Sequence, residues 1–187
     1  MSLEFNLEFP TENQVIVRFN GQKSDTVNFQ SPITSENLKD IHWYLEIYAA
    51  LYTTEIDDQR AQKIAQQLPL WGAKLLKSVL SEPKTINLFR QFKRQAQPGR
   101  LLTISASHPA ILSLPWELLC IPKGPYLFHD KPQISIRRRL ADSAENENRL
   151  KIQSKDRLHL FFVISRPKGA AFIDPRTAPR AVLDALE

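Results

Sequence analysis

Residues 3–19 read LEFNLEFPTENQVIVRF, and apolar side chains occupy every second position at both ends of this stretch. A period of two is typical of β-strands with one buried face, so the stretch predicts two strands. The pair Asn20-Gly21 follows at once and is a strong signal for a tight hairpin. Residues 26–29 then supply a returning strand. The opening of the chain, residues 1–30, is therefore predicted to form a small antiparallel unit.

Three segments after this unit repeat apolar residues at intervals of three and four, which places those residues on one face of a helix. The first helix is predicted to begin with Ser35 as its N-cap. The second starts at about Asp57 and is ended or kinked by Pro69 before its pattern continues. The third starts at Pro83 and stops at Pro98-Gly99. The aromatic residues on these faces are interpreted as core packing, with a ligand pocket as the alternative; they are Trp43, Tyr44, Trp71, Phe89 and Phe92.

The pattern changes again after Gly99. Residues 101–105 predict a strand, and residues 114–119 predict a short helix opened by Pro115. Residues 133–140 predict a further strand, whose outward face carries a run of arginines. The fold class predicted from these elements is mixed α/β.

The last part of the chain contains the most apolar strand signal. Residues 141–155 lack large apolar side chains before Leu150 and predict a solvated linker or loop. The run LHLFFVI at residues 158–164 is typical of a central parallel strand that is covered on both faces. A helix is then predicted to start at Asp174-Pro175. Such a strand needs further strand and helix units, so the sequence is expected to be truncated at Glu187.

Four regions follow from these patterns. They are an N-terminal accessory region of strands and helices at 1–99, a segment at 100–140, a linker or loop at 141–155, and a strand, loop and helix at 156–187. A sheet cut off in this way would expose a strand edge, so pairing into a homo-oligomer is expected as a consequence of truncation.

Composition excludes several classes of function. The net charge of +5 is diffuse, and its densest run, Arg137 to Arg139, has no interleaved aromatic platform, so nucleic-acid binding is not expected. No apolar run approaches the length of about 18 residues that a membrane span requires. Cys120 is the only cysteine, which excludes an internal disulfide and indicates a reducing, cytoplasmic location. Scattered histidines predict no metal site, and no cofactor is expected.

Several short segments together resemble a known family. ILSLPWELL at 111–119, GPYL at 124–127 and ISIRR at 134–138 resemble the leading part of CHAT domains, which are caspase-like. LFFVISRP at 160–167 and FIDPR at 172–176 are similar to the first strand and first loop of that caspase-like sheet. The resemblance covers the chain from about residue 100 onward, and a similar leader of strands and helices precedes the domain in some bacterial proteins.

The resemblance implies a cysteine endopeptidase in the intact protein. A His after one central strand would activate a Cys after the next, because a neighbouring imidazole favours the reactive thiolate. Neither residue is found at such a position here, so no catalytic residue is carried over. The chain is therefore predicted to be a non-catalytic N-terminal fragment whose partners are the rest of its peptidase domain and a protein or peptide substrate. The alternative is a pseudo-peptidase or an interaction scaffold without catalysis.

Five residues are candidates for a functional site. Cys120 with His108 or His129 would make a dyad, but Cys120 closes an apolar turn and is interpreted as a small buried hydrophobe. Arg166 and Asp174 flank the loop that follows the predicted central strand, where a caspase-like enzyme builds part of its substrate groove. They are candidates for a substrate subsite. The alternative is that Asp174 caps a helix and Arg166 is solvated.

Overall fold

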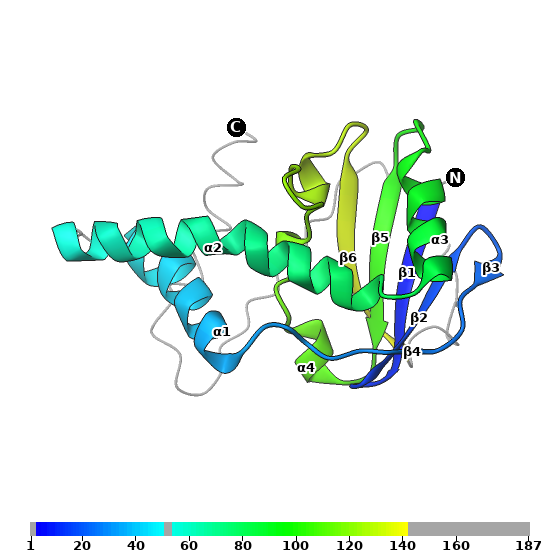
Figure 1. Ribbon diagram of the computed structural model, residues 1–187, viewed down its shortest axis with the longest axis horizontal. Coiled ribbons are helices and arrows are strands. Elements are labelled where there is room, and N and C mark those ends of the chain that lie inside the picture. Colours follow the sequence, from blue (N-terminus) through cyan, green and yellow to red (C-terminus); the bar gives the residue numbers. More distant parts are fainter. Residues whose placement is uncertain (1–2, 51–53, 142–187) are drawn as a thin grey trace, which may run out of the picture. The chain divides into compact units, whose positions relative to one another are not determined.

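The computed structural model describes residues 3–50 and 54–141, in which helices pack on a mixed β-sheet (Figure 1). The predicted fold class is thus confirmed. The strands of the described part are β1 Leu3–Thr11, β2 Gln14–Phe19, β3 Gln22–Lys23, β4 Val27–Asn28, β5 Arg100–Ala106 and β6 Ile134–Leu140. The α-helices are α1 Ser35–His42, α2 Glu55–Val79, α3 Pro83–Lys93 and the short α4 Pro109–Leu112. Brief helical turns, some of them 3-10, are η1 Trp43–Ile47, η2 Tyr48–Ala50, η3 Trp116–Leu118 and η4 Leu127–His129.

The six strands form one mixed sheet in the order β3-β2-β1-β5-β6, with β4 also paired to β2. β1 is central: Leu7 lies opposite Val17 on the antiparallel side and opposite Ile104 on the parallel side. The predicted antiparallel unit at the start of the chain is present, and its hairpin turn has positive φ at Asn20 and Gly21. The unit is not self-contained, because its free edge at β1 pairs with β5, a strand that follows the three helices in the sequence.

Helix boundaries differ from the predicted ones in three places. Thr34, not Ser35, caps α1, since its hydroxyl accepts the backbone N–H of Asn37 while Ser35 is already helical. α2 begins after Thr54, which forms a second capping box with Asp57. α3 ends at Lys93, and irregular backbone, rather than helix, leads to β5.

Pro69 lies inside α2, and the helix continues through it. A proline in a helix interior removes one hydrogen bond and usually costs about 3 kcal/mol. Here Trp71, Leu75 and Val79, on the turns after the proline, are buried in the core. The packing of these side chains supports the helical conformation beyond the interruption.

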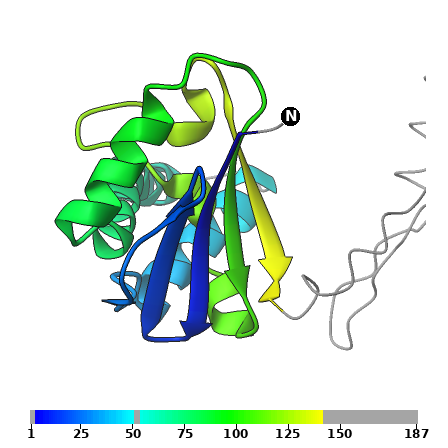
Figure 2. The same ribbon diagram turned by 90° about the vertical axis from the view of Figure 1, so that its right-hand side faces the viewer.

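The core lies between the sheet and the helices, which cover one face of the sheet (Figure 2). Trp116 is completely buried and packs on Phe9 at a ring distance of 5.6 Å. Its indole N–H donates to the carbonyl of Ile111 at 2.7 Å, so its polar atom is satisfied. The predicted helix at 114–119 is only a 3-10 turn, because Pro115 has a non-helical ψ of 68°.

The aromatic residues of the helices divide into two groups. Trp71, Phe89 and Phe92 are buried, which confirms the interpretation as core packing. Trp43 and Tyr44 are half-buried and pack against Tyr48 at ring distances of 5.4 and 5.9 Å. Among the described residues, no helix has the length and apolar character that a bilayer span requires.

Candidate functional site

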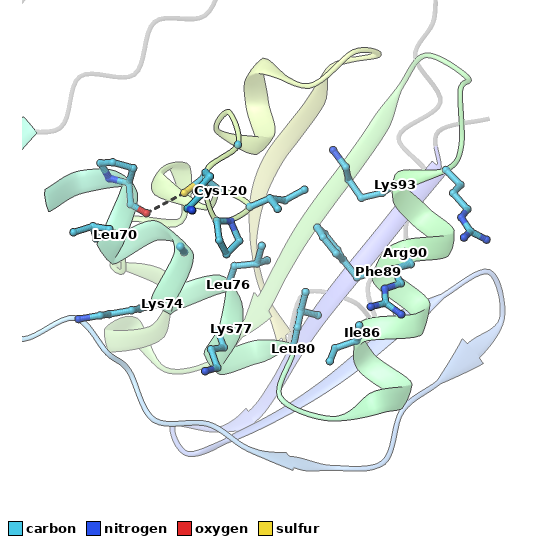
Figure 3. A pocket seen from close by; sticks show the side chains of 17 residues that line it. Leu70, Lys74, Leu76, Lys77, Leu80, Ile86, Phe89, Arg90, Lys93 and Cys120 are labelled. Atoms are coloured by element: carbon cyan, nitrogen blue, oxygen red, sulfur yellow. Dashed lines mark hydrogen bonds between the residues drawn. The ribbon is translucent and has the colours of Figure 1, made fainter. Parts of the chain in front are cut away.

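A groove runs between α2, α3 and the loop 120–124, with a volume of about 1150 Å³ (Figure 3). Its floor is apolar. Leu76 of α2 and Leu80, which caps that helix, face it from one side, and Ile86 and Phe89 face it from α3. Each pair is spaced by three or four residues, so the floor is the continuation of two helical faces that also build the core. Of the five aromatic residues interpreted above as core packing, Phe89 alone also lines this groove.

The loop that closes one end of the groove is held tightly against α2. Gly72 lies under the η3 turn so closely that an added Cβ would be 1.7 Å from the carbonyl oxygen of Leu118. Cys120 follows this turn, and its thiol donates to the carbonyl oxygen of Pro69 at 3.1 Å. Beyond Cys120, the exposed side chain of Ile121 extends the apolar lining. A glycine in α2 and a thiol in the loop therefore fix the position of this wall.

The rim of the groove is cationic. Lys74 and Lys77 project from α2 on one side of the floor, and Arg90 and Lys93 project from α3 on the other (Figure 3). The remaining basic lining residues are Arg94 and Lys123, and the lining contains no Asp or Glu. Lys93 pairs with Asp130, but within residues 3–50 and 54–141 the other five cations form no ion pair. In the described part of the chain, the site thus combines an apolar floor with a rim on which Lys93 alone of the six cations has an acidic partner.

Cys120 has the environment of an inert thiol. Its residue is 2 % exposed, and burial raises the pKa of the thiol above its ordinary value. His108 instead contacts Glu12 at 3.1 Å, and the ring of His129 packs on Phe128 at 4.2 Å. The structure therefore places Cys120 against a backbone carbonyl and gives both histidines other neighbours. The interpretation of Cys120 as a small buried hydrophobe is confirmed, and its contact with α2 gives it a positioning role as well.

We expect Cys120 to react with iodoacetamide at pH 7.4 at least about ten-fold more slowly than a free thiol, because only the exposed thiolate is a nucleophile. The rate can be followed by mass spectrometry of the native chain. The same chain unfolded in urea provides the control and should react at the free-thiol rate. A fast reaction in the native state would contradict the buried, neutral thiol.

The arginine run of β6 is engaged within the protein. Arg137 pairs with Glu4 across the sheet at 3.0 Å, and Arg139 reaches the same carboxylate at 4.0 Å. Arg138 forms a two-pronged pair with Glu117, which lowers the pKa of Glu117 through hydrogen bonding that outweighs burial. The run therefore joins β6 to β1 and to the η3 turn, and its three arginines share two carboxylates.

A charge cluster around the buried Arg100 lies beside the groove. Arg100 is 1 % exposed, and its guanidinium donates to the Asp130 carboxylate at 2.7 Å. Lys93 pairs with the same carboxylate, so the cluster connects α3, β5 and the segment that follows η4. Burial alone would raise the pKa of Asp130, but hydrogen bonds from Lys93 and Arg100 outweigh it and hold that pKa below its ordinary value. The cluster anchors the groove wall that carries Lys93.

The sequence did not indicate this cluster. Arg100 directly follows Gly99 in the sequence, and this position gives no sign of burial. The only available signal was the placement of Arg100 at the start of an apolar strand, in the register of buried residues.

The proposed subsite residues Arg166 and Asp174 lie outside the described residues, as do the predicted strand at 158–164 and the linker apart from Ala141. Within the described residues, no group of His, Cys, Asp and Glu could hold a metal ion. Comparisons with protein-family models, with curated proteins and with solved structures find no match for this chain.

Proposed function

We propose that residues 3–140 form a non-catalytic, protein-binding module at the front of a CHAT-type, caspase-like protein. The observation that carries the proposal is the apolar groove between α2 and α3, which is open to solvent and has a cationic rim without Asp or Glu in its lining. Exposed apolar surface of this kind is typical of interaction sites. The neutral, buried thiol of Cys120 favours a role in binding over one in catalysis.

The intact protein is proposed to be a cysteine peptidase, with its His and Cys supplied by sequence that follows Glu187. The resemblance of 111–138 and 160–176 to CHAT domains supports this part of the proposal, and the cytoplasmic location indicated by the single cysteine belongs to it. The alternative is a pseudo-peptidase or scaffold with the same binding module. The two hypotheses are distinguished by whether the completed domain contains a His and a Cys at neighbouring strand ends.

Two assays on the 1–187 chain test the module. Wild-type protein and Cys120→Ala should show the same absence of cleavage with a fluorogenic peptide library. The dye 1-anilinonaphthalene-8-sulfonate, an anionic aromatic probe, should bind in the groove and brighten. Leu70→Glu, at a lining residue that is 54 % exposed, should weaken dye binding by about five-fold.

The control for the dye is Ile56→Glu, since Ile56 is on the same helix, is 78 % exposed and does not line the groove. Dye binding should remain at the wild-type level in this variant. Cleavage by the wild-type chain that disappears in Cys120→Ala would contradict the non-catalytic assignment. Equal dye binding by the two glutamate variants would show that the groove is not an accessible binding site.

A further inference from the structure

The charges around the groove are arranged along its length. Lys74 and Lys77 are one turn apart on α2, and Arg90 on α3 is one turn before Arg94, the residue that caps the C-terminus of α3. The apolar floor lies between Lys74 and Lys77 on one side and Arg90 on the other (Figure 3). A single anionic headgroup would call for cations that converge on one point. Two parallel rows instead match a ligand that carries negative charge on both flanks of an apolar stripe.

The walls of the groove select the conformation of such a ligand. Both long walls are α-helices, whose interior backbone groups are already hydrogen-bonded within the helix. An extended peptide laid between them would find no sheet edge to pair with and would leave its own backbone groups unpaired. A helix satisfies its backbone internally and presents apolar side chains at spacings of three and four. It is therefore the peptide conformation that this groove accommodates.

The size of the groove agrees with a short helix. The wall formed by residues 69–79 of α2 rises about 16 Å, or three helical turns. The volume of about 1150 Å³ exceeds the range of about 300–1000 Å³ that is typical of small-molecule pockets. Leu70 and Ile121 lie at the exposed margin and can contact the edges of a ligand's apolar stripe.

We propose that this groove binds an amphipathic α-helix of a partner protein, with leucine-like side chains on the floor and Glu or Asp on both flanks against Lys74, Lys77, Arg90 and Arg94. This inference rests on the proposed function and adds the chemistry of the partner. Charge complementarity carries it, because the lining supplies cations on both sides of the apolar floor and no carboxylate.

The test uses the 1–187 chain and three fluorescein-labelled peptides of about 18 residues, long enough to be helical in water. All three share one leucine stripe and differ only at the flanking positions, which carry Glu, Gln or Lys. Fluorescence anisotropy should show the Glu peptide binding about ten-fold more tightly than the Gln peptide, with the Lys peptide weakest. The advantage of the Glu peptide should shrink as salt is raised.

The protein variant Lys77→Glu/Arg90→Glu reverses one charge in each row. It should weaken binding of the Glu peptide by about ten-fold and tighten binding of the Lys peptide. Lys39→Glu/Lys63→Glu changes the net charge equally at exposed positions outside the lining and should leave the order of the peptides unchanged. Circular dichroism of both variants checks that the fold is retained.

Equal binding of the three peptides, or no binding of any of them, would overturn the inference. So would tight, groove-dependent binding of phosphatidylglycerol vesicles without binding of the Glu peptide, since the ligand would then be a lipid surface. A chain that shows no cysteine-dependent cleavage and binds the dye but ignores the Glu peptide would refute the acidic helix and leave the proposed function standing. Cysteine-dependent cleavage would refute the proposed function whatever the peptides do.

Discussion

Replacing Asp130 with Ala is expected to lower the free energy of unfolding by about 3 kcal/mol, because a buried Arg100 would lose its carboxylate partner. The side chain of Arg100 is 1 % exposed, and its guanidinium lies 2.7 Å from the Asp130 carboxylate. Its bonds to the carbonyls of Lys93 and Pro132 would remain, but these do not neutralise its charge. The expected loss of stability is at the low end of the range of about 3–5 kcal/mol for breaking a buried ion pair, because the side chain of Asp130 is itself 19 % exposed. Urea unfolding followed by circular dichroism measures the loss.

A double variant separates the buried charge from a general loss of packing. Arg100→Met/Asp130→Leu removes both charges and keeps apolar volume, so it should recover most of the stability that Asp130→Ala loses. If Asp130→Ala were within about 0.5 kcal/mol of the wild type, as a surface change would be, Arg100 could not be a buried charge that depends on this partner.

The same pair predicts a dependence on pH. The folded-state pKa of Asp130 lies below its ordinary value of 3.8, so the stabilisation from its carboxylate is fully present above that value. It is lost as the pH falls through the folded-state pKa, because the protonated acid no longer neutralises Arg100. The stability difference between wild type and Asp130→Ala should therefore be constant from pH 7 to about pH 5 and narrow below about pH 4. A constant difference throughout acid unfolding would contradict the depressed pKa.

The sequence predicted the elements whose signal is local. The alternation of residues 3–9 and 15–19 gave β1 and β2, and Asn20-Gly21 gave the turn, because both depend only on neighbouring residues. The strands β5 and β6 were also predicted, and the predicted bounds of each are within one residue of the observed ones. The pairing of β1 with β5 was not predicted, since roughly ninety residues separate the two strands along the chain.

The groove and its anchors were missed because each depends on contacts between distant segments. The sequence left open whether Pro69 ends or kinks the helix, and the buried side chains of Trp71 and Leu75 lie on the part of α2 that continues beyond it. The apolar faces of α2 and α3 predicted core, and nothing in either face shows that part of it stays open between the helices. The burial of Arg100 depends on Asp130, thirty residues later in the chain. The predicted site residues Arg166 and Asp174 lie outside the described residues and stay predictions.

Gly72→Ala is expected to destabilise the protein by about 2–3 kcal/mol, although alanine is the better helix former by about 1 kcal/mol. The added methyl would lie 1.7 Å from the carbonyl oxygen of Leu118 and 2.7 Å from its carbonyl carbon. These are backbone atoms, so a side-chain rotation cannot relieve the clash, and the η3 turn must move away from α2. That turn carries the fully buried Trp116, so the movement disturbs the core.

The displacement should also reach the groove, because Cys120 follows the same turn and donates to Pro69. In native Gly72→Ala, the reaction of the thiol with iodoacetamide should therefore accelerate several-fold, while urea unfolding reports the lost stability. Gly124→Ala is the matched control, since its added methyl would have no neighbour nearer than 3.3 Å and should change stability by less than about 1 kcal/mol. A Gly72→Ala protein that is more stable than the wild type, with an equally protected thiol, would mean that helix propensity outweighs the clash. The loop would then not be held against α2, and the wall of the groove at Cys120 and Ile121 would be movable.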